Sequence, residues 1–231
     1  MHNPITPLLI THATAGCVML ITGIMAVAAR KANNYHRTAG KIYVGAATLV
    51  GITGFIIAIQ KNNQFLIATS VFVLYMVASA YRSLYLKQLY RVKKAQPIDW
   101  LIIAFATLAS VFLLILGGVA LHNGNMGGLV ATTFGTICAT FAIRDIKKFI
   151  KGPDDKKHWL YNHISGMLGS YIAGITAFLA VNAGFITKDF SLMVWLGPTI
   201  IGTPLIIYWT RKYKSKTTDL KQELGLKISV E

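Results

Sequence analysis

The stretch WLIIAFATLASVFLLILGGVAL, residues 100–121, contains no charged side chain. An α-helix rises 1.5 Å per residue, so about 20 apolar residues are enough to cross the roughly 30 Å hydrocarbon core of a bilayer. Soluble domains rarely contain an uninterrupted apolar segment of this length. The stretch therefore predicts a transmembrane helix.

Apolar runs of similar length lie on both sides of this segment, at residues 5–29, 41–59, 65–86, 129–150, 159–184 and 193–213. Only 13% of the residues are charged, about half the share in soluble domains. We therefore expect an all-α integral membrane protein, with a seven-helix transmembrane domain at 1–213 and a polar cytoplasmic tail at 214–231. The first basic residue, Arg30, follows the first run, which is typical of a retained helix rather than a cleaved signal peptide.

The basic residues predict which way the chain crosses the membrane. Of the 23 lysines and arginines, 21 fall in the connections after the first, third and fifth runs or near the C-terminus, and the other connections hold only Lys61 and Lys188. Cytoplasmic loops carry the excess of positive charge in multi-pass proteins. The N-terminus is thus expected outside and the C-terminus in the cytoplasm.

The formal net charge of +15 does not indicate a nucleic-acid partner, because the basic residues form short clusters between apolar runs. Such clusters face the anionic inner leaflet of a membrane, so the expected partner is the lipid bilayer. Cys17 and Cys138 both fall inside apolar runs, which gives no disulfide framework. The oligomeric state is not predicted.

Several polar residues continue stripes of small residues, which mark the packed faces of membrane helices. In the fifth run the stripe is Gly128, Ala131, Gly135, Cys138 and Ala142, and it ends at Asp145. Similar stripes lead back to His12 in the first run, to His36 just before the second run, and to His163 in the sixth run, where the stripe includes Gly166, Ser170 and Ala177. We therefore expect at least two of these four polar residues to face the bundle interior.

Depth divides the candidates into two groups. His36, Arg82, Asp145 and His163 fall at the cytoplasmic ends of their helices and form the predicted site, with Tyr81 and Met167 as secondary members. His12 lies near the outer end, roughly 20 Å or more from this group at 1.5 Å per residue. An ionisable residue within a span is costly and by default suggests function.

This set of residues leaves three functions open. His36 and His163, with Met167 as a substitute ligand, could ligate a b-type haem or a metal such as zinc. Alternatively, the histidines and Asp145 could relay protons in a transporter of a small solute or anion, with Arg82 as the anion clamp. A zinc-dependent intramembrane enzyme would have only His36, Asp145 and His163 at one depth. A retinal protein is excluded, because the seventh run lacks a lysine before Lys212.

Three segments resemble known proteins: His12 followed by HRTAGK at 36–41, AYR at 80–82, and RD at 144–145 leading through His163 to MLGSYIAGITAF at 167–178. Together they resemble an uncharacterised family of bacterial multi-pass membrane proteins over most of the chain. The resemblance implies an inner-membrane location and no activity, and it points to His12, His36, Arg82, Asp145 and His163. Cytochrome b561-type bundles are similar only in outline, because they pair histidines at both membrane faces.

Overall fold

The computed structural model describes residues 5–30, 33–90, 94–153, 155–183 and 192–228, with the backbone alone at residues 5 and 214–228. This part of the chain is helical and contains no strand. It forms the helices α1 (Ile5–Ala28), α2 (Asn34–Gln60), α3 (Gln64–Arg82), η1 (Ser83–Tyr85), α4 (Pro97–His122), α5 (Gly127–Lys151), α6 (His158–Val181) and α7 (Leu192–Ile228). All seven α-helices are long and apolar enough to cross a membrane.

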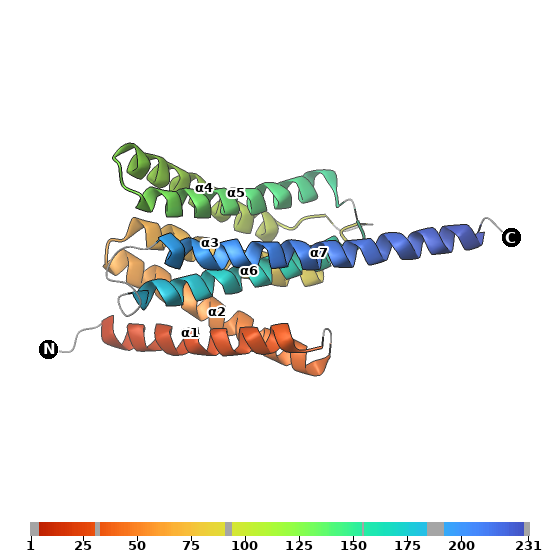
Figure 1. Cartoon of the computed structure of the whole chain (residues 1–231), viewed down its shortest axis with the longest axis horizontal. Helices are drawn as coiled ribbons and strands as arrows, with labels where there is room; N and C mark the ends of the chain where they lie inside the picture. The colour runs from red at the N-terminus through yellow and green to blue at the C-terminus, as the bar shows by residue number, and fades with distance from the viewer. Residues whose placement is uncertain (1–4, 31–32, 91–93, 154, 184–191, 229–231) are drawn as a thin grey trace.

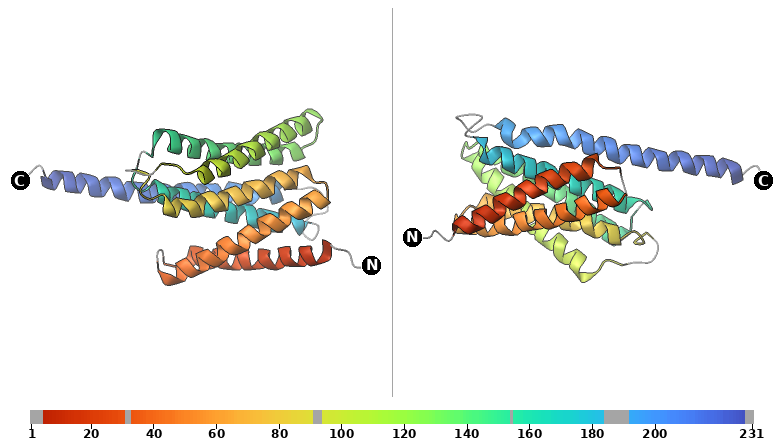
Figure 2. Two further views of the ribbon diagram at one scale, coloured as in Figure 1. Left: turned by 180° about the vertical axis from the view of Figure 1, so that it is seen from behind. Right: turned by 90° about the horizontal axis from the view of Figure 1, so that it is seen from below.

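The helices run up and down along one axis, and α3 is the central element. Figure 1 shows α4 and α5 together on one side, α1 and α2 on the other, and α3, α6 and α7 between them, and the views in Figure 2 agree. α3 packs against α2, α4 and α6, while α7 lies along α6. We call the end where α1, α3 and α5 finish and α2, α4 and α6 begin the basic end, because most lysines and arginines flank it.

Two of the predicted helix bounds are wrong. α2 begins at Asn34 rather than residue 41, because the Asn33 side chain caps it and accepts the His36 backbone N–H at 2.7 Å. The HRTAGK segment, which the prediction left largely before this helix, is therefore helical. α7 also continues past residue 213 to Ile228, so the described part of the predicted tail is a helical extension of α7 beyond the bundle.

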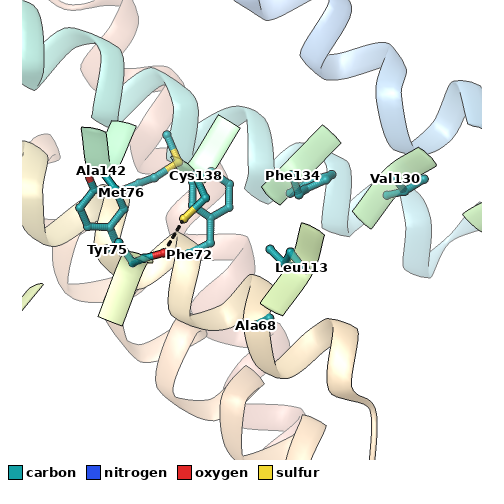
Figure 3. Close-up of a cluster of buried hydrophobic side chains, with 10 residues drawn as sticks. Ala68, Phe72, Tyr75, Met76, Leu113, Val130, Phe134, Cys138 and Ala142 are labelled. Carbon is teal, nitrogen blue, oxygen red and sulfur yellow. Dashed lines mark hydrogen bonds between the residues drawn. The ribbon is translucent and has the colours of Figure 1, made fainter. Parts of the chain in front are cut away.

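The main core lies where α3, α4 and α5 meet (Figure 3). Phe72 and Phe134 pack edge to face with ring centroids 6.2 Å apart. The Cys138 thiol donates to the Ala106 carbonyl oxygen at 3.3 Å, which explains the dashed line in Figure 3. A second cluster joins α1, α2 and α3 through Met19, Tyr43, Ala47 and Val77.

The outer surface of the bundle is apolar. Leu108 and Phe105 on α4 are 68% and 55% exposed, and Ile200 and Ile201 on α7 are 62% and 71% exposed. In water a surface of this kind would be an extensive hydrophobic patch, which monomeric soluble proteins avoid. Together with the seven apolar helices, it indicates a multi-pass membrane protein.

The small-residue stripes identify the packed face well on α5 and only partly on α6. Every member of the α5 stripe is buried, from Gly128 to Asp145. On α6, Gly166 and Ser170 are buried but Ala177 is exposed, while its neighbour Thr176 is buried. In the second half of α6 the buried face therefore includes Thr176 and not Ala177 of the predicted stripe.

Candidate functional site

Asp145 is a buried carboxylate in the last two turns of α5, and its residue is only 6% exposed. Its Oδ2 accepts the Tyr75 hydroxyl at 3.0 Å and the Ser79 hydroxyl at 2.6 Å. Its Oδ1 accepts the Lys148 ammonium at 2.6 Å and the Asn162 amide at 3.2 Å. Four donors from three helices therefore surround one charge, which is how a buried carboxylate becomes tolerable.

The local sequence explains why these donors converge. Tyr75 and Ser79 are four residues apart on α3, so they lie on one face of that helix. α6 approaches this face closely at Gly166, where a Cβ atom would stand 2.6 Å from the Ala80 Cβ and 3.1 Å from the Met76 carbonyl oxygen. This close approach brings Asn162, one turn earlier on α6, to Asp145.

Two small hollows flank the carboxylate, and both are lined by Asp145 and Ser79. The first lies among α3, α5 and α6 and is also lined by Tyr75, Arg144, Asn162 and Gly166. The second lies among α3, α4 and α5 and is also lined by Arg82, Asp99, Lys148 and Phe149. Each has a cavity volume of about 10 Å³, which is close to the space of one water molecule.

Lys148 holds its ammonium group inside the bundle. Its side chain is 9% exposed, and its Nζ lies 4.5 Å from the centre of the Phe149 ring as well as 2.6 Å from Asp145 Oδ1. The Phe149 ring in turn packs on Trp100, with ring centroids 6.0 Å apart. A carboxylate and an aromatic face thus enclose one primary ammonium group.

Arg82 and Arg144, the two arginines that by their depth in the sequence could pair with Asp145, do not pair with it. Arg82 pairs with Asp99, with Nε 2.8 Å from Oδ1 and Nη2 3.3 Å from Oδ2. Its Nη2 also donates to Gln96 Oε1 at 2.7 Å. Arg144 is exposed, and its guanidinium lies over the Phe141 ring at 5.5 Å.

The Arg82–Asp99 pair ties the end of α3 to the start of α4. Asp99 is 3% exposed, and its Oδ2 accepts the Gln96 backbone N–H at 2.8 Å as part of a capping box. Both carboxylate oxygens of Asp99 accept from the Arg82 guanidinium. An anion that bound Arg82 would therefore have to compete with Asp99. The pair acts as a structural clamp beside the Asp145 site.

The structure gives the two predicted ligand histidines different partners. His36 Nδ1 lies 2.9 Å from the Ala26 carbonyl oxygen, near the end of α1. His163 Nδ1 lies 3.3 Å from the Ala80 carbonyl oxygen, near the end of α3. Within the described part of the chain, no group of three or more His, Cys, Asp or Glu side chains is placed to hold a metal ion. Haem or zinc ligation by His36 and His163 stays a prediction.

The secondary candidates are spread over the bundle. Met167 packs partly buried against the cluster of α1, α2 and α3, and Tyr81 accepts the Tyr85 hydroxyl at 3.3 Å. His12 lies nearer the opposite end, with Nδ1 2.9 Å from Thr53 Oγ1. His158 places one ring nitrogen 3.1 Å from the Asp155 carbonyl oxygen and the other 3.1 Å from that of Leu86.

Sequence reasoning missed most of the partners of Asp145. The polar residues Tyr75 and Ser79 at a four-residue spacing in an apolar helix were a detectable signal. Gln96 and Asp99 before an apolar run also form a recognisable helix start. Lys148 and Asn162 carried no such signal, because only the packing of α5 on α3 and α6 brings them to the carboxylate.

No model of a known protein family matches the chain, and neither a curated protein nor a solved structure does.

Proposed function

We propose that this protein is a proton-coupled transporter of a small solute in the bacterial inner membrane. Its N-terminus lies outside, its basic end lies in the cytoplasm, and Asp145 is the central residue of its transport site. The uneven distribution of lysine and arginine supports this orientation. The resemblance of three sequence segments to bacterial multi-pass proteins supports the location.

One observation carries the proposal: a carboxylate buried in a membrane helix, with a water-sized hollow on each side. Burying a carboxylate inside a bundle of membrane helices costs free energy, and such residues usually bind ions or relay protons. The hydroxyl groups of Tyr75 and Ser79 hold its orientation. The hollows give water or a small solute a place beside it without displacing a helix.

Further polar pairs lie inside the bundle beyond this site. Tyr43 and Ser170 share a hydrogen bond of 2.7 Å between α2 and α6, about 12 Å along α6 from Asn162 at 1.5 Å per residue. His12 and Thr53 form another pair, nearer the opposite end, at 2.9 Å. These pairs support a path that continues across the membrane from Asp145.

The contacts of these residues fit a transport site better than they fit a haem or zinc site. His36 and His163 each direct a ring nitrogen to a backbone carbonyl of a different helix. Asp145 is directed to hydroxyl, amide and ammonium donors, which suits a group that exchanges a proton or a solute. For these reasons transport is preferred over cofactor binding.

Proton flux into liposomes tests the proposal. The purified chain is reconstituted with a trapped pH-sensitive dye, a potassium diffusion potential is imposed, and inorganic salts and small organic ions are added in turn. We expect the wild type to move protons faster than protein-free liposomes and Asp145→Asn to fall to the protein-free rate. Asp219→Asn is the matched control and should keep the flux, because Asp219 belongs to the part of α7 that continues beyond the bundle.

Two results would contradict the proposal. Wild-type liposomes could behave like protein-free liposomes under every added salt, which would remove transport as the function. Alternatively, Asp145→Asn could keep the wild-type flux, or Asp219→Asn could lose as much as Asp145→Asn. Either result would remove Asp145 as the transport site.

A further inference from the structure

The Asp145 site already contains a cation, which is the ammonium group of Lys148. Lys148 Nζ lies 2.6 Å from Asp145 Oδ1 and 4.5 Å from the Phe149 ring centre, and its side chain is 9% exposed. A carboxylate beside an aromatic face is a typical environment for ammonium groups. The site therefore already binds one primary ammonium group, that of Lys148, through a carboxylate and an aromatic ring.

We infer that the solute recognised at Asp145 is a small primary ammonium ion, and that Lys148 occupies its place when no solute is bound. This inference rests on the transport function proposed for Asp145. A free ammonium ion of the same chemistry can make the same contacts with the carboxylate and the ring. The long, flexible lysine stem lets the side chain move aside without changing the backbone.

The surroundings favour a cation over an anion. Asp145 provides the negative charge, and Asn162 can turn its amide oxygen toward a donor, because an amide holds both an acceptor and donors. Of the two arginines that line the hollows, Arg82 is held by Asp99 at 2.8 Å, and the Arg144 guanidinium lies over the Phe141 ring at 5.5 Å. The two hollows of about 10 Å³ each add space for about one water molecule apiece to the place that the Lys148 ammonium group leaves, which favours methylammonium or a similarly short primary ammonium ion.

Removing the lysine side chain should leave an empty ammonium site that an external ion can fill. The test measures the thermal unfolding of the full chain in detergent, with methylammonium chloride compared with equal concentrations of sodium chloride and tetramethylammonium chloride. We expect Lys148→Ala to lower the melting temperature and methylammonium to raise it again. Binding to the folded state raises apparent stability in this way. Sodium and the bulky tetramethylammonium ion should have little effect.

Two control variants make the test specific. Lys147→Ala removes the adjacent, exposed lysine and should not respond to methylammonium more than the wild type does. The double variant Asp145→Asn/Lys148→Ala lacks the carboxylate and should not respond either. If Lys148→Ala responds equally to methylammonium and sodium, or if the double variant responds like Lys148→Ala, the inference is wrong.

A second measurement on the wild type applies even if Lys148→Ala does not fold. An amine-reactive reagent labels lysines, and mass spectrometry gives the ratio of labelled Lys148 to labelled Lys147, which cancels the loss of reagent to methylammonium itself. We expect methylammonium to raise this ratio above its value in sodium chloride, because a displaced Lys148 becomes accessible. An unchanged ratio overturns the inference. A wild type that still moves protons in liposomes would then keep the transport function and lose only this solute.

Discussion

Asp145 and Asp99 are both buried carboxylates at the basic end, yet they differ in what surrounds them. Asp99 forms two contacts with one guanidinium and accepts a backbone N–H of its own helix start. Asp145 accepts hydroxyl, amide and ammonium donors from α3, α5 and α6. The first arrangement fixes a helix end, whereas the second brings side chains from several helices to one charge.

Tyr75→Phe tests the importance of a single donor to Asp145. The change removes the 3.0 Å hydrogen bond to Oδ2 and keeps the ring in the core. We expect a loss of about 1–2 kcal/mol in the free energy of unfolding, since hydrogen bonds to charged groups exceed the membrane-protein average of about 0.6 kcal/mol. Denaturation in mixed detergent micelles gives this value.

Tyr35→Phe is the control for this change, because Tyr35 is 53% exposed. It should alter the free energy of unfolding by less than about 0.5 kcal/mol, as is usual for surface substitutions. Equal losses in the two variants would show that the Tyr75 hydroxyl has no special place at the carboxylate.

At the scale of the helix, the close contact of α6 with α3 positions the site. Gly166→Leu would place side-chain atoms where Ala80 and the Met76 carbonyl already lie. We expect α6 to be pushed from α3, with a loss of about 1–3 kcal/mol in the free energy of unfolding as in other overpacked cores. The Asn162–Asp145 contact should weaken too, so proton flux should fall.

Gly118→Leu is the matched control, because Gly118 also lies in an apolar helix but has nothing within 4 Å of a Cβ atom. It should leave stability and flux near wild-type values. If Gly166→Leu behaves like Gly118→Leu, the close approach of α6 is not what positions Asn162.

The start of α2 depends on one capping side chain. Asn33→Ala removes the acceptor of the His36 N–H at 2.7 Å, and we expect a loss of about 1 kcal/mol in the free energy of unfolding. Asn34→Ala, at the first helical position, should cost less. If Asn34→Ala lowers the free energy of unfolding more than Asn33→Ala in the same detergent titration, Asn33 is not the residue that caps α2.

The sequence allowed the helices to be predicted because apolar length is a local property of the chain. It also allowed the burial of Asp145 to be predicted, since the stripe from Gly128 onward is a regular helical repeat. It did not allow the partner of Asp145 to be predicted, because Arg82, Arg144 and Lys148 are all cations near one depth. Only the rotation and spacing of α3, α4 and α5 decide that Arg82 faces Asp99 and that Lys148 turns inward.

The charged and apolar surfaces of the protein separate along the bundle axis. α7 carries this separation furthest, since its first part is apolar and its described continuation to Ile228 runs past the basic end. Lys212 Nζ lies 5.0 Å from the Trp209 ring centre near this transition, and a basic and aromatic pair of this kind is typical of a membrane interface.

Reporter fusions test the proposed orientation of the whole molecule. A fluorescent protein fused after Glu231 should fluoresce in bacterial cells, and alkaline phosphatase fused there should be inactive, because the proposed orientation puts the C-terminus in the cytoplasm. Phosphatase fused after Gly124, between α4 and α5, should be active, because four spans bring this connection to the outer side. The lysines and arginines concentrated at the basic end support this orientation, because such residues are enriched in cytoplasmic loops. Active phosphatase at the C-terminus would invert the orientation, and would place Asp145 near the outer rather than the inner face.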